Sequence, residues 1–126
     1  MKEKWLKNLT PEQKRICYQC GTEPAFRNKY WNLKEIGTYH CICCDQELFS
    51  SSSKFDSGSG WPSFTNPISS SLIEEHEDRS FGMLRTEVKC NNCKSHLGHV
   101  FDDGPGSRGL RYCINSTSLN FKKKNL

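Results

Sequence analysis

Two Cys-x-x-Cys pairs constrain the fold of this 126-residue chain more than any other feature of its sequence. They are Cys41/Cys44 and Cys90/Cys93, and each follows a strand-like segment and stands four residues before a leucine. A turn with this spacing presents two thiolates to one tetrahedral Zn²⁺. Because the pairs lie far apart in the chain, one zinc ion would clamp two distant hairpins together. Four thiolates leave no open coordination position, so the sequence predicts one structural zinc ion per chain.

The cysteines also allow other interpretations. The two pairs could be buried structural residues or redox dithiols. A zinc finger that combined the second pair with His96 and His99 is excluded, because the two residues between Cys93 and His96 cannot wrap a tetrahedral site. A third pair, Cys17/Cys20, suggests a general thiol-disulfide oxidoreductase, but the βαβ context typical of that motif is missing.

The composition limits the classes of partner. The net charge is only +4, and the basic run at residues 122–124 suggests a solubilising tail. A zinc-ribbon module for nucleic acid or protein is the alternative from another class, but no aromatics interleave with a basic stripe, so we expect no nucleic-acid partner. No apolar run approaches the roughly 20 residues that span a bilayer, and the N-terminus carries no secretory signal. We therefore expect a cytoplasmic protein without a membrane partner, whose eight cysteines serve metal binding or catalysis.

Short β segments dominate the middle and the end of the chain. Residues 38–42, 85–90 and 110–115 alternate or carry β-formers, with turn residues between them. Serines surround residues 54–64, but three large aromatics interrupt this stretch, and a flexible linker would not leave them in water. We therefore expect a packed loop there, a single domain over residues 1–126, and a mainly β fold built from antiparallel strands.

The N-terminal region predicts a short helical arm. Thr10 can cap a helix, and Gln13, three residues later, completes a capping box. We expect this helix to run to about Cys20 and to stop at the glycine that follows. The two ends of the chain, at about residues 1–8 and 122–126, are expected to be frayed.

The sequence around Cys113 suggests a reactive thiol. In a strand, alternation places Arg111, Cys113 and Asn115 on one face, and Tyr112 and Ile114 on the other. A guanidinium group beside a thiol favours the thiolate, which is the nucleophilic form. The alternative is a core cysteine on a half-buried strand.

Two histidines and two aromatics are candidates for the rest of the site. Gly98 permits a tight bend by which His96 and His99 could converge as donors or acids, although one histidine of such a pair is often structural. Trp61, held extended by the proline after it, could form an apolar wall with Phe64, and the alternative is a core tryptophan. The residues alone thus indicate a cysteine-nucleophile enzyme with a structural metal.

Several long motifs resemble the methionine sulfoxide reductase B family. They are GTEPAF at residues 21–26, KFDSGSGWPSF at 54–64, HLGHVFDDGP at 96–105 and RYCINS at 111–116. Together with both cysteine pairs, they extend the resemblance from about Leu9 to Phe121. The resemblance implies two antiparallel sheets packed as a β-tent, with the zinc ion away from the active site, and we expect a monomer. It also implies repair of oxidised methionine by reduction of the R epimer of methionine sulfoxide, free or in proteins.

The same resemblance implies roles for individual residues. Cys113 attacks the sulfoxide sulfur as the nucleophile while His99 donates a proton to the oxygen, and Trp61 holds the S-methyl group. The remaining substrate-binding residues are Phe64, His96, Asp103, Arg111 and Asn115. Cys113 then becomes a sulfenic acid, a second thiol converts it to a disulfide, and thioredoxin or a similar reductant restores the thiols.

At one position the sequence departs from the commonest pattern of the family. Many relatives have a cysteine immediately before the GWPSF run, where this chain has Ser59, and a hydroxyl cannot form a disulfide. The spare thiols are Cys17, Cys20 and Cys43. We expect Cys20 to be the resolving cysteine and Cys17 to be the second choice, whereas Cys43 should be held away by its own turn. Direct reduction of Cys113 by thioredoxin or a small thiol is the alternative.

Overall fold

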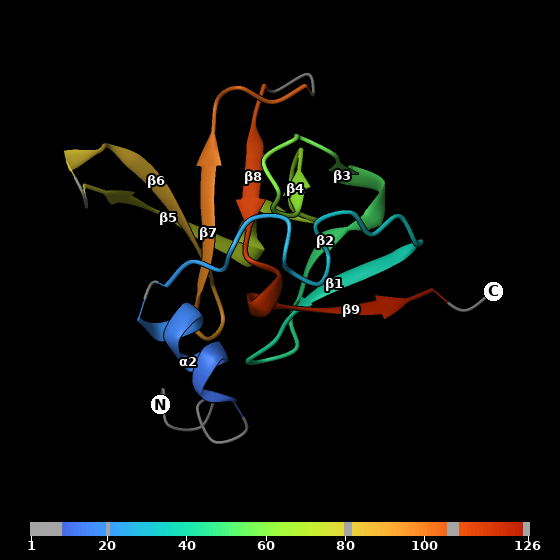
Figure 1. Ribbon diagram of the computed structural model, residues 1–126, viewed down its shortest axis with the longest axis horizontal. Helices are drawn as coiled ribbons and strands as arrows, with labels where there is room; N and C mark the ends of the chain where they lie inside the picture. The colour runs from blue at the N-terminus through green and yellow to red at the C-terminus, as the bar shows by residue number, and fades with distance from the viewer. Residues whose placement is uncertain (1–8, 20, 80–81, 106–108, 125–126) are drawn as a thin grey trace.

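The computed structural model describes residues 9–19, 21–79, 82–105 and 109–124, which form two antiparallel β-sheets with one short α-helix on the N-terminal side (Figure 1). The smaller sheet has the order β2-β1-β9, with β1 at Gly37–Cys41, β2 at Glu47–Ser50 and β9 at Leu119–Lys123. The larger sheet has the order β3-β4-β8-β7-β6-β5. Its strands are β3 (Lys54–Phe55), β4 (Ser63–Phe64), β5 (Ile73–Asp78), β6 (Arg85–Cys90), β7 (His96–Phe101) and β8 (Arg111–Ile114). The predicted mainly β fold is therefore confirmed.

The expected N-terminal helix is α2, at Pro11–Tyr18. Its capping box is complete, because Gln13 N donates to Thr10 Oγ1 (3.1 Å) and Thr10 N donates to Gln13 Oε1 (2.8 Å). The helix ends at Tyr18, slightly before the predicted end at Cys20, which lies outside the described residues. No helix among the described residues is long and apolar enough to cross a membrane.

Short 3₁₀ turns connect strands within the described part of the chain. They are η1 (Ser51–Ser53), η2 (Ser70–Leu72) and η4 (Ser116–Ser118). Helix α2 packs on η4 and on β7, and it buries Ile16 and Cys17 there. The N-terminal arm is thus held against the strands that carry the candidate site.

An aromatic cluster joins the two sheets. Tyr39 and Phe49 come from the smaller sheet, whereas Phe64 and Tyr112 come from the larger one, and all four are at most 1% exposed. The Phe49 and Phe64 rings stack at 4.4 Å, and Tyr39 meets Phe64 edge-on at 5.0 Å. Each aromatic pair contributes roughly 0.5–1.5 kcal/mol in addition to the free energy gained by burying its surface. The cluster therefore stabilises the packing of the two sheets against each other.

The predicted strands and the packed loop are confirmed, but the C-terminal end differs from the expectation. The segments predicted at 38–42, 85–90 and 110–115 correspond to β1, β6 and β8. Residues 54–64 include β3 and β4, and bury Pro62 and Phe64. The expected frayed end at 122–126 is wrong for its first residues, because β9 pairs with β1 as far as Lys123. Residues 1–8 and 125–126 lie outside the described residues.

Strands β7 and β8 approach each other closely at Gly98. The pairs are Gly98↔Ile114, His99↔Cys113 and Val100↔Tyr112. A Cβ atom at Gly98 would lie 2.0 Å from the carbonyl oxygen of Cys113, so only a glycine allows this spacing.

We predict that Gly98→Ala lowers the free energy of unfolding by about 3 kcal/mol or more, because the added methyl meets the rigid backbone of β8. Urea denaturation would measure the change. The matched control is Gly58→Ala, where a Cβ meets nothing within 4 Å. That control should cost only the roughly 1–2 kcal/mol of a left-handed backbone. A Gly98→Ala variant as stable as the native protein would contradict the close approach.

Candidate active site and metal centre

Four cysteines converge at the turns between β1 and β2 and between β6 and β7. The sulfurs of Cys41, Cys44, Cys90 and Cys93 all lie within 4.8 Å of one another. Two of the separations are 3.5 Å (Cys41 to Cys93) and 3.6 Å (Cys44 to Cys90). Zinc–sulfur bonds of about 2.3 Å in a tetrahedron place sulfurs about 3.8 Å apart, so the cluster fits such an ion. The four cysteines predicted as metal ligands are therefore positioned to bind one metal ion.

The two cysteine turns share one backbone geometry. Asp45 N donates to Cys41 O and Lys94 N donates to Cys90 O, both at 2.9 Å. The residue after each second cysteine has a left-handed backbone, with φ of 66° at Asp45 and 64° at Lys94. The similar sequence frames of the two pairs thus correspond to two similar turns, which face each other across the sheets.

Two polar side chains lie beside the cysteine sulfurs and can hydrogen-bond with thiolates. Gln46 Nε2 lies 3.5 Å from the sulfur of Cys90, and Ser95 Oγ lies 3.4 Å from the sulfur of Cys93. Four thiolates this close repel one another unless a cation lies between them. The closed set of ligands leaves no position for a substrate, so a metal here holds the fold.

Cys113 lies in a small pocket on the opposite face of β8 from the core. Tyr112 and Ile114 are buried at 1% and 0% exposure, whereas Cys113 is half-buried, as strand alternation predicted. The pocket has a volume of about 110 Å³. Its lining consists of Thr22, Trp61, Arg85, His96, Gly98, His99, Phe101, Cys113, Ile114 and Asn115. The predicted site residues Cys113, Trp61, His96, His99 and Asn115 therefore do come together.

A β-bulge brings the two histidines onto the pocket face. Between the pairs Val88↔Gly98 and Lys89↔His96, strand β7 contains one extra residue, Leu97. The extra residue lets His96 and His99, three positions apart, share one face of the strand. Their ring centroids lie 5.5 Å apart. The predicted convergence is confirmed, but its cause is this bulge and not a tight bend at Gly98.

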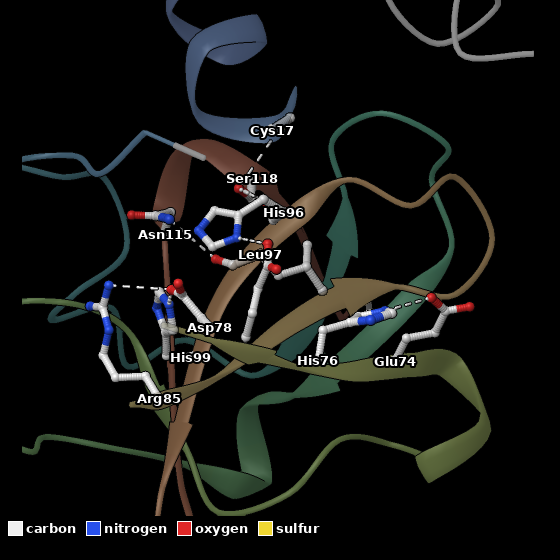
Figure 2. Close-up of polar contacts among 11 residues, drawn as sticks. Cys17, Glu74, His76, Asp78, Arg85, His96, Leu97, His99, Asn115 and Ser118 are labelled. Atoms are coloured by element: carbon white, nitrogen blue, oxygen red, sulfur yellow. Dashed lines mark hydrogen bonds and ion pairs between the residues drawn. The ribbon is translucent and has the colours of Figure 1, made fainter. Parts of the chain in front are cut away.

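Each histidine is paired with a carboxylate. His96 Nδ1 lies 2.7 Å from Glu87 Oε2, and His99 Nε2 lies 2.8 Å from Asp78 Oδ2. Since an ionised carboxylate only accepts hydrogen bonds, the imidazole is the donor in both pairs. Figure 2 shows Asp78 between the His99 ring and Arg85, whose Nη2 lies 3.3 Å from the same carboxylate oxygen. The carboxylates therefore set the orientation of both rings.

His96 is the more deeply buried of the two histidines. His96 is 3% exposed, and its burial lowers the pKa of the imidazole although Glu87 opposes the shift. His96 is accordingly a neutral imidazole at neutral pH. It suits a hydrogen-bonding role more than that of a proton source.

Arg111 and Asp103 form an ion pair at the edge of the site. Arg111 Nε donates to Asp103 Oδ1 at 2.8 Å, and its guanidinium carbon lies 4.5 Å from the centre of the Phe101 ring. This pairing lowers the pKa of the Asp103 carboxyl. Asp103 is exposed, and neither Asp103 nor Arg111, both predicted to bind substrate, is among the residues that line the pocket.

The ionisation of Cys113 differs from the expectation. Burial raises the pKa of its thiol, and this effect is larger than the lowering by the positive charge of Arg111 and by a hydrogen bond with Ser59. The expectation that Arg111 favours the thiolate is right in direction. The expectation of a readily ionised thiol is wrong, because desolvation dominates and the pKa is raised overall.

The segment before β1 closes the pocket from a side that the sequence did not suggest. Trp61 Nε1 donates to the carbonyl oxygen of Glu23 at 2.9 Å, which fixes the indole ring. The Glu23 carboxylate, itself buried, accepts from Thr117 N at 2.8 Å. Asn115 donates from Nδ2 to Leu97 O at 3.3 Å. One buried carboxylate therefore joins this segment to the end of β8.

Phe64 is not part of the pocket, which corrects the prediction of a substrate-binding role. It pairs with Tyr112 across β4 and β8, so it shares the core face of the sheet. Its exposure is 0%, and its ring stacks on Phe49. Phe101 supplies the second aromatic ring of the pocket instead.

Several residues of the site were missed by the sequence reasoning. They are Thr22, Asp78, Arg85, Glu87 and Phe101. Alternation in the predicted strand 85–90 was the one available signal, because it places the side chains of Arg85 and Glu87 on one face. No pattern in the sequence pairs Asp78 with His99, since that contact depends on the register between β5, β6 and β7.

The spare thiols lie away from the pocket where they are described. Cys17 is 1% exposed, and its sulfur lies 3.8 Å from Ser118 Oγ. Cys43 belongs to the first cysteine turn and does not line the pocket, as expected. Cys20, the expected resolving cysteine, lies outside the described residues.

Comparison with known proteins identifies a single family. The SelR domain family matches residues 9–123. The peptide methionine sulfoxide reductase MsrB of Acinetobacter baylyi is 61% identical over 118 residues, which are 94% of this chain and 85% of that protein. The protein of the same name from Acinetobacter baumannii is 59% identical over the same shares. The one from Pseudomonas putida is 57% identical over 122 residues, which are 97% of this chain and 92% of that protein.

We predict that removal of the metal with a strong chelator unfolds the protein near room temperature. Apparent zinc affinities in such sites are about 10–16 kcal/mol, comparable with a whole-domain stability of about 5–15 kcal/mol. Circular dichroism would follow the unfolding, and elemental analysis should find one ion per chain.

Neighbouring positions provide the matched variants for this experiment. Cys44→Ser removes a ligand and should lose the ion, whereas Cys43→Ser changes the adjacent thiol and should keep it. A Cys44→Ser variant that retains one ion per chain and the native melting temperature would contradict the assigned ligand set.

Proposed function

Because this chain belongs to the SelR family of methionine sulfoxide reductases, we propose that it reduces the R epimer of methionine sulfoxide, free or in proteins, with Cys113 as the nucleophile. The family makes the chain an oxidoreductase of methionine sulfoxide. One observation carries the proposal. A half-buried thiol lines a pocket of about 110 Å³ between a fixed indole ring and two imidazoles paired with carboxylates. A pocket of this size suits a methyl sulfoxide group and not a whole side chain with its backbone.

The walls of the pocket differ in a way that supports selection of one epimer. Trp61 and Phe101 offer aromatic faces for the S-methyl group, and aromatic–sulfur contacts contribute roughly 0.3–1.5 kcal/mol. His99 in its imidazolium form and the amide of Asn115 offer hydrogen-bond donors for the sulfoxide oxygen. When one wall holds the methyl group and another holds the oxygen, the orientation of the chiral sulfur is fixed. Only one of the two epimers then presents the side of the sulfur that Cys113 can attack. Enzymes of this class act on one epimer each.

The proposed chemistry transfers the sulfoxide oxygen to Cys113. The sulfur of Cys113 attacks the sulfoxide sulfur and forms a sulfur–sulfur bond. The sulfur–oxygen bond of the substrate then breaks as the oxygen moves to the sulfur of Cys113, and the sulfur–sulfur bond breaks as methionine leaves. The products are methionine and a sulfenic acid at Cys113, so the methionine sulfur gains the two electrons that the cysteine loses. Because the pKa of the free thiol is raised, Cys113 gives up its proton in the step in which the sulfoxide oxygen gains one.

His99 is the proposed proton donor, and the other polar residues orient the substrate. In its imidazolium form, His99 keeps one N–H on Asp78 and has a second proton for the sulfoxide oxygen. Asn115 binds the oxygen through its amide N–H. His96, held neutral with its one N–H on Glu87, presents Nε2 as an acceptor to the polar network around the substrate. Arg111, fixed by Asp103, provides positive charge beside the sulfur of Cys113.

A metal in the four-cysteine cluster supports this site indirectly. We propose Zn²⁺ as the ion, because four soft thiolates in a tetrahedron suit it. The ion would supply cross-linking of the two sheets and no chemistry. We propose that the chain acts as a monomer.

Recycling of the sulfenic acid needs a second thiol. Cys20 is the proposed resolving cysteine, since Cys17 is buried against Ser118 and Cys43 lies in a metal-binding turn. A thioredoxin-like dithiol then reduces the disulfide by exchange. The cytoplasm, where such dithiols keep cysteines reduced, is the proposed compartment.

Cys113→Ser should abolish formation of methionine from either free or peptide-bound methionine-R-sulfoxide, because a serine hydroxyl is not a comparable nucleophile. The native protein should convert the R epimer at least 100-fold faster than the S epimer, a factor that corresponds to about 2.7 kcal/mol of discrimination. Each epimer would be incubated separately with the enzyme and with dithiothreitol as reductant, and chromatography would quantify the methionine formed. The same assay measures the loss of activity in Cys113→Ser and the ratio of the rates for the two epimers. Native-rate turnover by Cys113→Ser, or equal rates for the epimers, would refute the proposal.

Cys20→Ser should separate the chemical step from recycling. The variant should release one equivalent of methionine per enzyme yet lose multiple turnover with thioredoxin, because the sulfenic acid at Cys113 finds no partner. Cys43→Ser is the matched control and should turn over normally. If Cys20→Ser turns over with thioredoxin at the full rate, Cys20 is not the resolving cysteine, and the alternatives are Cys17 and direct reduction of Cys113.

A further inference from the structure

Three serine hydroxyls form a continuous chain beside Cys113. Ser57 Oγ lies 2.7 Å from Ser59 Oγ and 2.7 Å from Ser63 Oγ. At one end of the chain, Ser63 Oγ lies 3.2 Å from the carbonyl oxygen of Trp61. At the other end, Ser59 faces Cys113, and its hydroxyl lowers the pKa of the Cys113 thiol, as a hydrogen-bond donor to the sulfur does. Together these contacts connect the sulfur to a backbone carbonyl through three hydroxyls.

The fold holds this chain rigidly next to the sulfur. Ser63 is fully buried, and it pairs directly with Cys113 across strands β4 and β8. Side chains of directly paired residues lie on the same face, with Cβ atoms about 4.5–5.5 Å apart. The backbone also fixes Ser59, because Trp61 N lies 3.4 Å from its hydroxyl oxygen. The serines are therefore held in place by the pairing of β4 with β8 and by the backbone at Trp61.

When Cys113 is a thiol, the number of available protons fixes the donor and the acceptor of each hydrogen bond along the three serines. Each hydroxyl donates one proton and can accept others. The sulfur then donates to Ser59, Ser59 donates to Ser57, and Ser57 donates to Ser63. Ser63 donates to the carbonyl oxygen of Trp61 at the end of the chain. Every proton is used, and no hydrogen bond has two donors or none.

The direction of these hydrogen bonds reverses when Cys113 loses its proton. A thiolate can only accept, so Ser59 must turn its hydroxyl toward the sulfur. Ser57 then donates to Ser59, and Ser63 donates to Ser57 in place of Trp61. Only the long contact to the carbonyl is lost, while a charge-assisted hydrogen bond to sulfur is gained, and such bonds are roughly twice as strong as neutral ones.

We infer that Ser59, Ser57 and Ser63 form a reversible hydrogen-bond relay that stabilises the anion of Cys113 during the attack on the substrate. This inference rests on the proposed role of Cys113 as nucleophile. The three serines are positioning residues: Ser59 acts on the sulfur, whereas Ser57 and Ser63 act through it. The relay offsets part of the desolvation that burial imposes on the anion.

The other groups that face Cys113 are independent of the serines. Arg111 lies on the same strand and favours the anion, whereas the Glu23 carboxylate opposes it. His99 is the direct partner of Cys113 on β7, and His96 and Arg85 line the same pocket. The side-chain hydroxyl of Ser57 hydrogen-bonds with Ser59 and Ser63 and not with any of these residues, so a substitution at Ser57 isolates the relay.

The test is the pH dependence of alkylation of Cys113 by iodoacetamide, followed by mass spectrometry of the peptide that contains it. The variants are Ser57→Ala and Ser59→Ala, with Ser59→Thr as the rescue that keeps a hydroxyl. Ser52→Ala is the matched control, because its hydroxyl bonds Ser50 at the surface and lies outside the relay. Melting temperatures would show that each variant is folded.

Ser59→Ala should raise the apparent pKa of Cys113 by about one unit, which is the size expected for loss of one hydrogen bond to a charged group. Ser57→Ala should raise it by roughly half as much, because polarisation along the chain is lost. Ser59→Thr and Ser52→Ala should leave it within about 0.2 units of the native value. Single-turnover formation of methionine should fall with the same order among the variants.

An unchanged pKa in both alanine variants would overturn the relay, and so would an equal shift in Ser52→Ala. These outcomes differ from a failure of the proposed function. In that case, Cys113→Ser would still form methionine, whatever the serines do to the thiol.

Discussion

The four-cysteine cluster is the contact on which the arrangement of the molecule depends. It joins the turn between β1 and β2 to the turn between β6 and β7, and thus connects the two sheets. Strand β7 begins at His96, three residues after the ligand Cys93. The metal turn therefore determines where β7 starts, and the bulge at Leu97 follows immediately. The four-cysteine cluster and the histidine pair are thus separate sites that one strand connects.

The site itself depends on opposing demands on one thiol. Burial gives Cys113 a dry pocket but raises its pKa, and Arg111 and Ser59 offset only part of that effect. A thiol that stays protonated until the substrate arrives is protected from other oxidants, because the thiolate is the reactive form. In the proposed mechanism, His99, paired with Asp78, provides the proton that the sulfoxide oxygen needs. Fixed orientation, and not an unusually acidic cysteine, is the main contribution of the fold.

Local patterns in the sequence predicted a large part of this structure. The alternation at residues 110–115 separated Cys113 from Tyr112 and Ile114 correctly, and the repeated cysteine turns identified the metal cluster. Phe64 was assigned to the pocket because it lies close to Trp61 in sequence, but the register with β8 turns it into the core. Asp78 and Glu87 reach the histidines only through the pairing of three strands. Contacts that depend on register and desolvation have no local signal, which is why the pKa of Cys113 was also misjudged.

The most direct measurement of the central claim is chemical trapping of the oxidised enzyme after one turnover. The protein would be mixed with one equivalent of methionine-R-sulfoxide in the presence of dimedone, which reacts with sulfenic acids, and then digested for mass spectrometry. The account predicts a dimedone adduct on Cys113 in proportion to the methionine formed, and none with the S epimer. Methionine formed while Cys113 stays unmodified, with the adduct on another cysteine, would contradict it.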